Sequence, residues 1–326
     1  MRPFAYERAQ DAAGAVAAVD ARTMFLGGGT NLVDLMKLGV ATPERLVDVS
    51  HLPLDAIEER PDGGVRIGAT VRNSDAATSP LVRERFPVLS QALLAGASGQ
   101  LRNMATVAGN LLQRTRCPYF QDVSKPCNKR EPGSGCPARD GEHRNLAVIG
   151  HSPHCVATHP SDMAVALQAL GAEVHVTGPA GDRVIPMPGL HRLPGDEPQR
   201  DTVLEPGELI TAIEVPAGAA AATSAYRKVR DRASFAFAVV SIAAAVELAA
   251  DGTIADARIA FGGLAHVPWR AERAETALRG NQPTAETFAA AADAELAQAR
   301  PLRDNAFKVP LARNLLVRTL QELTTR

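Results

Sequence analysis

The sequence is poor in aromatic residues, in cysteine and in unbalanced charge. Of its 326 residues only 4% are aromatic and 4 are cysteines, and its formal net charge at pH 7 is −1. Without a basic block, nucleic acid or an anionic membrane is not expected as the main partner, because both require clustered lysines and arginines. No apolar run approaches the roughly 18 residues of a membrane span. The polar start "MRPFAYERAQ" also lacks the apolar segment of a secretory signal.

Motifs of hydrolytic or acid–base catalysis are also missing. The chain has no HExxH, no GxSxG and no pair of carboxylates in a marked context. We therefore expect no catalytic side chain, and instead a bound cofactor that supplies the chemistry. Four cysteines are too few for a disulfide scaffold of this length. They favour a reducing compartment, where clustered cysteines more often bind metal or take part in redox reactions.

The hydrophobic pattern divides the chain into three units. Residues 1–100 alternate between strand and helix, residues 101–220 carry a long irregular insertion at about 114–155, and residues 221–326 follow. In the first unit "TMFLGGG" predicts a strand, while "TNLVDLMKLG" and "LVRERFPVLSQALLAGAS" each predict one helix. "NMATVAGNLLQ" predicts a strand and a loop. The last unit is expected to hold a three-stranded antiparallel sheet around the turn "ADGT", followed by three helices.

Two loops of small residues are candidate phosphate sites. "LGGGTNL", residues 26–32, joins a predicted strand to a predicted helix, where glycines let backbone N–H groups converge. It is neither the Rossmann fingerprint nor a P-loop, and a tight strand-to-helix turn explains it about as well. "NMATVAGNL", residues 103–111, is a second such loop or a bend at a crowded crossing. Together, the two loops suit a pyrophosphate held from both sides.

Three of the four cysteines lie in "RTRCPYFQDVSKPCNKREPGSGCPARD", residues 114–140. Cys117, Cys127 and Cys136 are followed by Cys155, with nine, eight and 18 residues between successive cysteines. This spacing matches neither common zinc sites nor bacterial ferredoxins. Four thiolates nevertheless suit a tetrahedral iron–sulfur or zinc centre. Buried free thiols and two disulfides are the alternatives, and the polar loop sequence argues against buried thiols. A loop this long also needs a ligand or a function to order it.

Six segments, in order along nearly the whole chain, resemble the FAD-binding subunit of the xanthine dehydrogenase and aldehyde oxidoreductase family. They are "LGGGTNLVDLMKLG", "ATVAGNL", "HPSDMAVALQALGAEV", "GELITAIEVP", "YRKVRDRASFAFAVVSIAAAVEL" and "ARIAFGGLAHVPWRAERAE". In that family the FAD-binding subunit is the medium subunit of three-part molybdenum hydroxylases. The resemblance implies an α+β protein. It has a two-lobed FAD-binding fold of the vanillyl-alcohol oxidase (PCMH) type, followed by a C-terminal α+β domain with a three-stranded antiparallel sheet and helices.

The resemblance also implies which residues hold FAD. The two small-residue loops hold the diphosphate, Asp162 approaches the cofactor from a helix start, and Lys228 lies near the flavin. Ile210 and Ile213 contact FAD through backbone atoms. Without the family, Asp162 is explained as a carboxylate favoured by a helix N-terminus, and Lys228 as a solvated strand residue. The cofactor-binding residues expected are Leu26, Gly27, Gly28, Gly29, Thr30, Asn31, Leu32, Thr106, Gly109, Asn110, Asp162, Ile210 and Lys228.

Most FAD subunits of this family lack a cysteine-rich insertion. A subset carries one that binds a [4Fe–4S] cluster, notably bacterial periplasmic aldehyde oxidoreductase and, with a different insertion, 4-hydroxybenzoyl-CoA reductase. The flanks "RCPYF", "PCNKR", "GCPAR" and "HSPHCVATHPSD" resemble the aldehyde oxidoreductase type. The resemblance thus implies a [4Fe–4S] cluster on the four cysteines, and the nearby flavin favours iron–sulfur over zinc. The histidines around the last cysteine are expected beside the cluster or at the surface: His151, His154 and His159.

The function implied is electron transfer. An aldehyde is oxidised at the molybdenum cofactor of a large subunit, and electrons pass through [2Fe–2S] clusters of a small subunit to FAD on this chain. FAD then hands them to an external acceptor, in a heterotrimer. Alternatives are a related hydroxylase acting on xanthine, an aromatic heterocycle or an aromatic acyl-CoA, a stand-alone flavoenzyme, and a metal-braced scaffold. The location expected is cytoplasmic by the chain's own sequence, or periplasmic by co-export with a partner that carries a twin-arginine signal.

Overall fold

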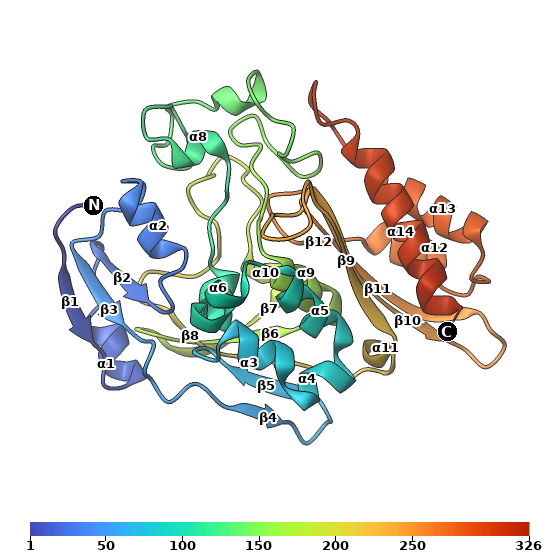
Figure 1. The fold of residues 1–326 in the computed structure, drawn as a ribbon, viewed down its shortest axis with the longest axis horizontal. Helices are drawn as coiled ribbons and strands as arrows, with labels where there is room; N and C mark the ends of the chain where they lie inside the picture. The colour runs from blue at the N-terminus through green and yellow to red at the C-terminus, as the bar shows by residue number, and fades with distance from the viewer. Residues whose placement is uncertain (326) are drawn as a thin grey trace.

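The N-terminal strands form a small parallel sheet in a computed structural model that describes residues 1–325 (Figure 1). Its strand order is β1-β3-β2. Because β2 ends at Leu26 and α2 begins at Leu32, the glycine segment is the turn at the carboxyl end of this sheet. The elements of this part are β1 (Ala5–Arg8), α1 (Ala12–Ala17), β2 (Thr23–Leu26), α2 (Leu32–Lys37) and β3 (Arg45–Asp48).

A five-stranded antiparallel sheet lies below the helices of the centre in Figure 1. Its order is β4-β5-β8-β6-β7, and β5 pairs with β8 from Val65 opposite Val215 to Gly68 opposite Ala212. The sheet therefore takes strands from both sides of the unit boundary predicted near residue 100. Its strands are β4 (Ile57–Glu59), β5 (Val65–Gly68), β6 (Glu173–Gly178), β7 (Gly181–Pro186) and β8 (Leu209–Val215).

Seven helices belong to this central region, and all except the one at Gly99–Met104 contribute residues to its hydrophobic core. Two segments of this region differ from the structure that the sequence predicted. The helix predicted across "LVRERFPVLSQALLAGAS" is two helices, because Phe86 precedes a proline and takes a non-helical backbone, with φ −133° and ψ 58°. The strand predicted in "NMATVAGNLLQ" is instead the end of one helix, at Met104, and the whole of the next, Val107–Leu111, which Thr106 caps. The helices are α3 (Asn73–Thr78), α4 (Pro80–Arg85), α5 (Pro87–Ala95), α6 (Gly99–Met104), α7 (Val107–Leu111), α9 (Asp162–Leu170) and α10 (Met187–Leu190).

The C-terminal part is an antiparallel sheet with helices α12 to α14 on one face and α9 and α5 on the other (Figure 1). The sheet has four strands rather than the predicted three, because Trp269 pairs with Phe261 and Arg270 with Ala260. A strand of two residues is too short to show a period in the sequence. The elements are α11 (Ala219–Ala222), β9 (Ser224–Val229), β10 (Val240–Leu248), β11 (Ile254–Gly262), β12 (Trp269–Arg270), α12 (Glu272–Leu278), α13 (Ala285–Leu296) and α14 (Lys308–Thr324).

The insertion forms the upper edge of the molecule in Figure 1 and is largely irregular, as predicted. It contains the short helix α8 (Pro118–Gln121) and the 3₁₀ turn η1 (Pro137–Arg139). Its own small hydrophobic cluster includes Phe120, Leu146 and Val156 together with two of the cysteines. None of the helices within residues 1–325 is both long enough and apolar enough to cross a membrane.

Candidate flavin and metal sites

The two small-residue loops meet, as the sequence suggested. A Cβ atom on Gly28 would lie 1.9 Å from the carbonyl oxygen of Met104 and 3.0 Å from Cα of Ala105, so only glycine allows this approach. Of the three consecutive glycines only Gly29 has positive φ, at 72°. The first loop therefore needs glycine for two reasons: Gly29 takes a positive φ, and Gly28 lets the second loop approach closely. The sequence could not show the second reason.

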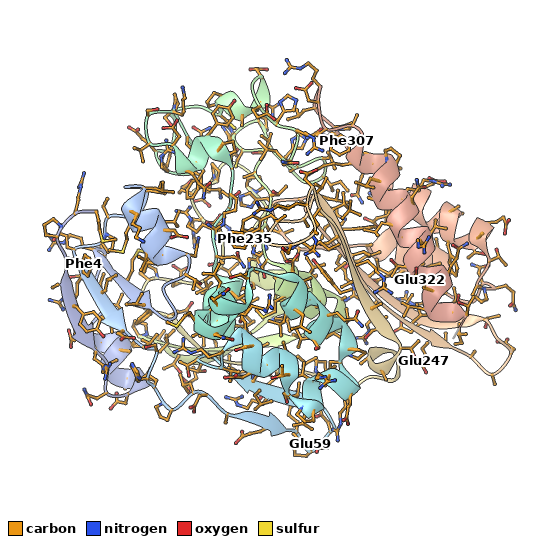
Figure 2. The ribbon with its side chains drawn as sticks, viewed as in Figure 1. Phe4, Glu59, Phe235, Glu247, Phe307 and Glu322 are labelled. Atoms are coloured by element: carbon orange, nitrogen blue, oxygen red, sulfur yellow. The ribbon has the colours of Figure 1, made fainter. Side chains whose placement is uncertain are left out.

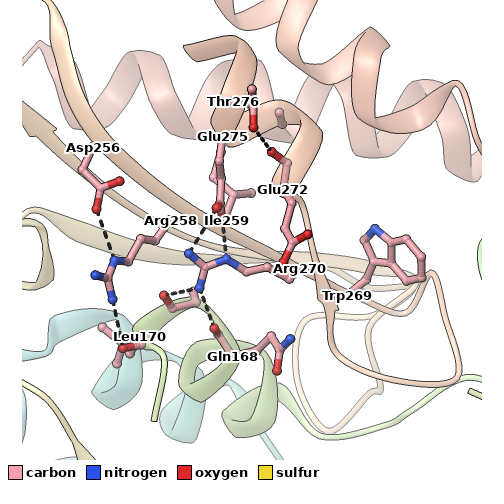
Figure 3. Close-up of polar contacts among 12 residues, drawn as sticks. Gln168, Leu170, Asp256, Arg258, Ile259, Trp269, Arg270, Glu272, Glu275 and Thr276 are labelled. Carbon is pink, nitrogen blue, oxygen red and sulfur yellow. Dashed lines mark hydrogen bonds and ion pairs between the residues drawn. The ribbon is translucent and has the colours of Figure 1, made fainter. Parts of the chain in front are cut away.

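Helix α9 places Asp162 at the junction of the central region and the C-terminal sheet. All nine residues of α9 are buried. The Ser161 hydroxyl accepts a hydrogen bond from the N–H of Ala164 and caps the helix. At the other end, Arg270 Nη1 donates to the carbonyls of Gln168 and Ala169 at 2.8 and 2.9 Å (Figure 3). A cation at a helix C-terminus is favourable, so both ends of the helix are held.

Asp162 meets two side chains of β9. Lys228 Nζ donates to Oδ2 at 2.8 Å, and the Tyr226 hydroxyl donates to Oδ1. Burial raises the pKa of Asp162, and the Lys228 charge opposes that rise. The two residues expected beside the cofactor from separate motifs are therefore in direct contact. Tyr226 was not predicted, although it lies two positions from Lys228 on the same face of the strand.

A cavity of about 370 Å³ opens where these elements meet. It lies between the glycine loops, α5, α6, the start of α9 and the loop after β9. Six predicted residues line it, namely Thr30, Asn31, Gly109, Asn110, Asp162 and Lys228. The others do not lie on its wall and stay predictions: Leu26, Gly27, Gly28, Gly29, Leu32, Thr106 and Ile210. Ile210 and Ile213 are in the hydrophobic core.

The sequence did not point to several other residues of this wall. Ala97 and Phe235 both line the cavity and both have positive φ, 50° and 49°, which is unusual away from glycine. Figure 2 labels Phe235 near the middle of the molecule, on the loop after β9. The next aromatic residue of that loop, Phe237, stacks under the guanidinium of Arg116 at 5.0 Å. The loop therefore closes one side of the cavity with aromatic rings.

The wall suits an anionic, flavin-sized ligand. Asn31 Nδ2 and Arg116 Nε are buried donors without a hydrogen-bond partner, and both residues line the cavity. Buried polar groups normally have partners, so unpaired donors indicate a ligand that accepts from them. A second cavity of about 280 Å³ shares Arg116, Asp162 and Phe237 with the first. The two adjoining cavities leave room for an extended molecule.

The four cysteines surround one small cavity in the insertion. Cys117, Cys127, Cys136 and Cys155 all line it, and all four thiols are free, which excludes the disulfide alternative. Two of them, Cys117 and Cys155, are buried, contrary to the expectation for a polar loop. Burial raises the pKa of Cys117 to about 12 and that of Cys155 to about 11, where the Lys129 charge opposes the rise. A metal would have to displace these protons.

The insertion is ordered by its own polar side chains. Asn128 accepts from the N–H of Gly135 at 2.7 Å and donates to the carbonyl of His154 at 3.0 Å. Arg130 Nη1 donates to the carbonyls of Tyr119 and Phe120 at 2.5 and 2.6 Å. The loop thus wraps around the thiols with its backbone groups paired.

The three histidines flanking Cys155 have different surroundings. His154 lines the thiol cavity and lies 3.3 Å from Asp196, while His151 contacts the carbonyl of Arg300 at 2.7 Å. His159 is half-buried, packs edge-on against His191 with ring centroids 4.3 Å apart, and lines the second large cavity instead. Within residues 1–325, the one group of three or more histidine, cysteine or acidic side chains with ligand atoms within 4.8 Å of one another is Glu173, His175 and Glu214, and it contains no cysteine.

The family follows from comparison with known proteins. The sequence model of the family described as "FAD binding domain in molybdopterin dehydrogenase" matches residues 2–218. The chain belongs to this family. The model described as "CO dehydrogenase flavoprotein C-terminal domain" matches residues 224–323. The chain is 50% identical to the aldehyde oxidoreductase FAD-binding subunit PaoB of Escherichia coli, covering 99% of this chain and 98% of that protein.

Further members of the family share the fold. The chain is 28% identical to the carbon monoxide dehydrogenase medium chain of Hydrogenophaga pseudoflava, over 93% of this chain and 89% of that one. A solved structure of carbon monoxide dehydrogenase from the same organism superposes with a TM-score of 0.77 at 28% identity, covering 98% and 96% of the two chains. The α+β FAD-binding fold expected from the resemblance is thereby confirmed.

Proposed function

We propose that this chain is the FAD- and [4Fe–4S]-containing electron-transfer subunit of a molybdenum-dependent aldehyde oxidoreductase. The observation that carries the proposal is 50% identity to an aldehyde oxidoreductase FAD-binding subunit over nearly the whole length of both chains. The partners proposed are a molybdenum-cofactor subunit and a [2Fe–2S] subunit, together with an external electron acceptor. When bound, the flavin accepts electrons and passes them on. The chain's own residues bind and orient it.

The flavin residues have distinct tasks in this proposal. Asn31 and Arg116 offer unpaired donors to the diphosphate, and Gly28 lets the two loops approach closely enough to hold it from both sides. The Asp162–Lys228 pair, fixed by α9 and β9, presents a buried charge pair at the cavity wall. Phe235 and Phe237 line the cavity on the side of the loop after β9 and offer apolar surface to the cofactor.

The geometry of the thiols favours an iron–sulfur cluster over a single zinc ion. A tetrahedral zinc with Zn–S bonds of about 2.3 Å holds its thiolates roughly 3.8 Å apart. No three cysteine sulfurs among the described residues lie within 4.8 Å of one another. All four nevertheless line one cavity. A wider centre containing several iron atoms suits this spread, and four thiolates are its usual ligands. Cys117, Cys127, Cys136 and Cys155 are the ligands that we propose.

The substrate range and the cellular location of the complex both depend on partner subunits. The aldehyde meets the molybdenum subunit, so the substrate range is a property of the partner. A hydroxylase acting on another substrate is the alternative, because 28% identity links the chain to carbon monoxide dehydrogenase as well. The cytoplasmic location, or export to the periplasm with a partner, stays a prediction.

Anaerobic titration of the purified complex with an aldehyde tests the function. The flavin absorbance of the complex should bleach, whereas the isolated chain with the same aldehyde should not change. Bleaching of the isolated chain would instead indicate a stand-alone flavoenzyme. Cys127→Ser should remove the cluster, and Lys125→Met, an exposed change in the same loop, should not. Should Cys127→Ser lose the cluster but keep normal assembly and electron transfer, the cluster neither carries electrons nor braces the subunit.

A further inference from the structure

A buried lysine lies beside the thiol cavity. Lys129 lines the cavity together with all four cysteines, and its side chain is only 1% exposed. A lysine is rarely buried to this extent without a partner of opposite charge. Because Lys129 is one of the residues that line the thiol cavity, it brings a positive charge beside the proposed metal site and away from water.

The ammonium group of Lys129 has three contacts. It donates to the carbonyl of Pro198 at 2.7 Å and to a carboxylate oxygen of Asp201, and it lies 2.7 Å from His266 Nε2. His266 Nδ1 is 2.9 Å from the carbonyl of Arg192 and therefore donates to it, so Nε2 accepts from the ammonium and the imidazole is neutral. The lysine is thus fully satisfied as a cation.

Asp201 is shared with a second cation. Its other oxygen accepts from Arg114 Nε at 2.7 Å. Two positive charges, Lys129 and Arg114, therefore face one negative charge, and the group carries a net charge of +1. Arg114 also joins this group to the flavin site, since its backbone N–H donates to Asn31 Oδ1 at 2.9 Å. The charge is thus rigidly placed between the two proposed cofactor sites.

We propose that Lys129 is a positioning residue that sets the reduction potential of the cluster, with Asp201 opposing it. The inference rests on the proposed function, because it requires a [4Fe–4S] centre on the four cysteines. Reduction adds one negative charge to a centre that already carries four thiolates. A fixed positive charge in a poorly screened interior stabilises the reduced state and raises the potential. Asp201 acts in the opposite direction and also holds the ammonium in place.

A purely structural role predicts a different result. If Lys129 only pairs with Asp201 and the Pro198 carbonyl, its replacement would lower stability or cluster content but leave the potential of the remaining cluster unchanged. The electrostatic role instead predicts shifts of opposite sign for the two partners. Lys129→Met should lower the reduction potential and Asp201→Asn should raise it. Lys129→Arg keeps the positive charge, so its potential should lie closer to the native value than that of Lys129→Met.

The test is an anaerobic redox titration of the holo-complex with mediators and dithionite, monitored by electron paramagnetic resonance. Lys125→Met is the matched control, because it removes the same charge from an exposed position in the same loop and should shift the potential least. Iron and acid-labile sulfide are measured on every variant. An unshifted potential in Lys129→Met with an intact cluster, or shifts of the same sign in Lys129→Met and Asp201→Asn, would overturn the inference. A wild-type complex whose iron and acid-labile sulfide are fully explained by the [2Fe–2S] subunit would overturn the cluster assignment as well.

Discussion

The contact between the two small-residue loops gives a sharp prediction for Gly28→Ala. The added methyl group would lie 1.9 Å from the carbonyl oxygen of Met104, 2.7 Å from its carbonyl carbon and 3.0 Å from Cα of Ala105. All three are backbone atoms, so no side-chain rotation relieves the overlap. The loops must separate by more than about 1 Å to restore ordinary contact distances. Overpacking of this kind costs about 1–3 kcal/mol.

The strain should appear mainly as lost FAD affinity. Without the cofactor the loops can separate, but with FAD bound both must converge on the diphosphate. A cost of about 1–3 kcal/mol expressed in the bound state weakens binding by about 5- to 150-fold. We expect Gly28→Ala to be purified with less flavin and to release FAD faster on dilution, as followed by the recovery of flavin fluorescence.

Gly99→Ala is the matched control for this change. A Cβ on Gly99, at the start of α6, meets nothing within 4 Å, and alanine favours a helix over glycine. It should leave the flavin content unchanged. If Gly28→Ala retained the native FAD content and release rate, the two loops would not jointly hold the cofactor, and the proposed diphosphate site would be wrong.

Two further predictions concern buried polar groups. Lys228→Met leaves the Asp162 carboxylate buried without its cation and should destabilise the chain by about 3–5 kcal/mol in urea unfolding. This loss of unfolding free energy should shrink as pH falls. The pKa of Asp162 is raised in the folded state, so the folded protein binds a proton there at a higher pH than the unfolded chain does, and the protonated carboxyl no longer needs a cation. Adding Asp162→Asn should recover part of the loss, and a double mutant as unstable as the sum of both changes would contradict the pairing. Asn305→Ala removes donors to the carbonyls of residues 143, 146 and 147 in the insertion and should cost about 1–3 kcal/mol, whereas the exposed Asn281→Ala should change stability by less than about 0.5 kcal/mol. Equal melting temperatures for the two asparagine variants would show that Asn305 does not fasten the insertion to the C-terminal part.

The sequence was most informative where local pattern decides the structure. The strand before Gly27 and the helix after Asn31 each follow from residue type and spacing. The family resemblance then predicted the overall fold and brought Asp162 and Lys228 together. Their direct ion pair was not predicted, because 66 residues separate them along the chain.

The features that the sequence did not reveal depend on burial. Lys129 stands in a polar loop sequence, and nothing local shows that it lies inside the protein beside Asp201, 72 residues away. Cys117 and Cys155 are buried because Phe120, Leu146 and Val156 pack around them from three separate stretches of the insertion. Tertiary packing therefore decided the environment of the thiols, while the residue types alone identified them as possible ligands.

The central claim is that this chain holds both FAD and a [4Fe–4S] cluster. It is tested most directly by measuring flavin, iron and acid-labile sulfide in the purified complex and recording absorbance spectra before and after dithionite. We predict one FAD in this chain and a [4Fe–4S] contribution that Cys127→Ser removes and Lys125→Met leaves intact. A complex whose iron and sulfide are fully explained by the [2Fe–2S] subunit, with no difference between wild type and Cys127→Ser, would contradict a cluster on these cysteines.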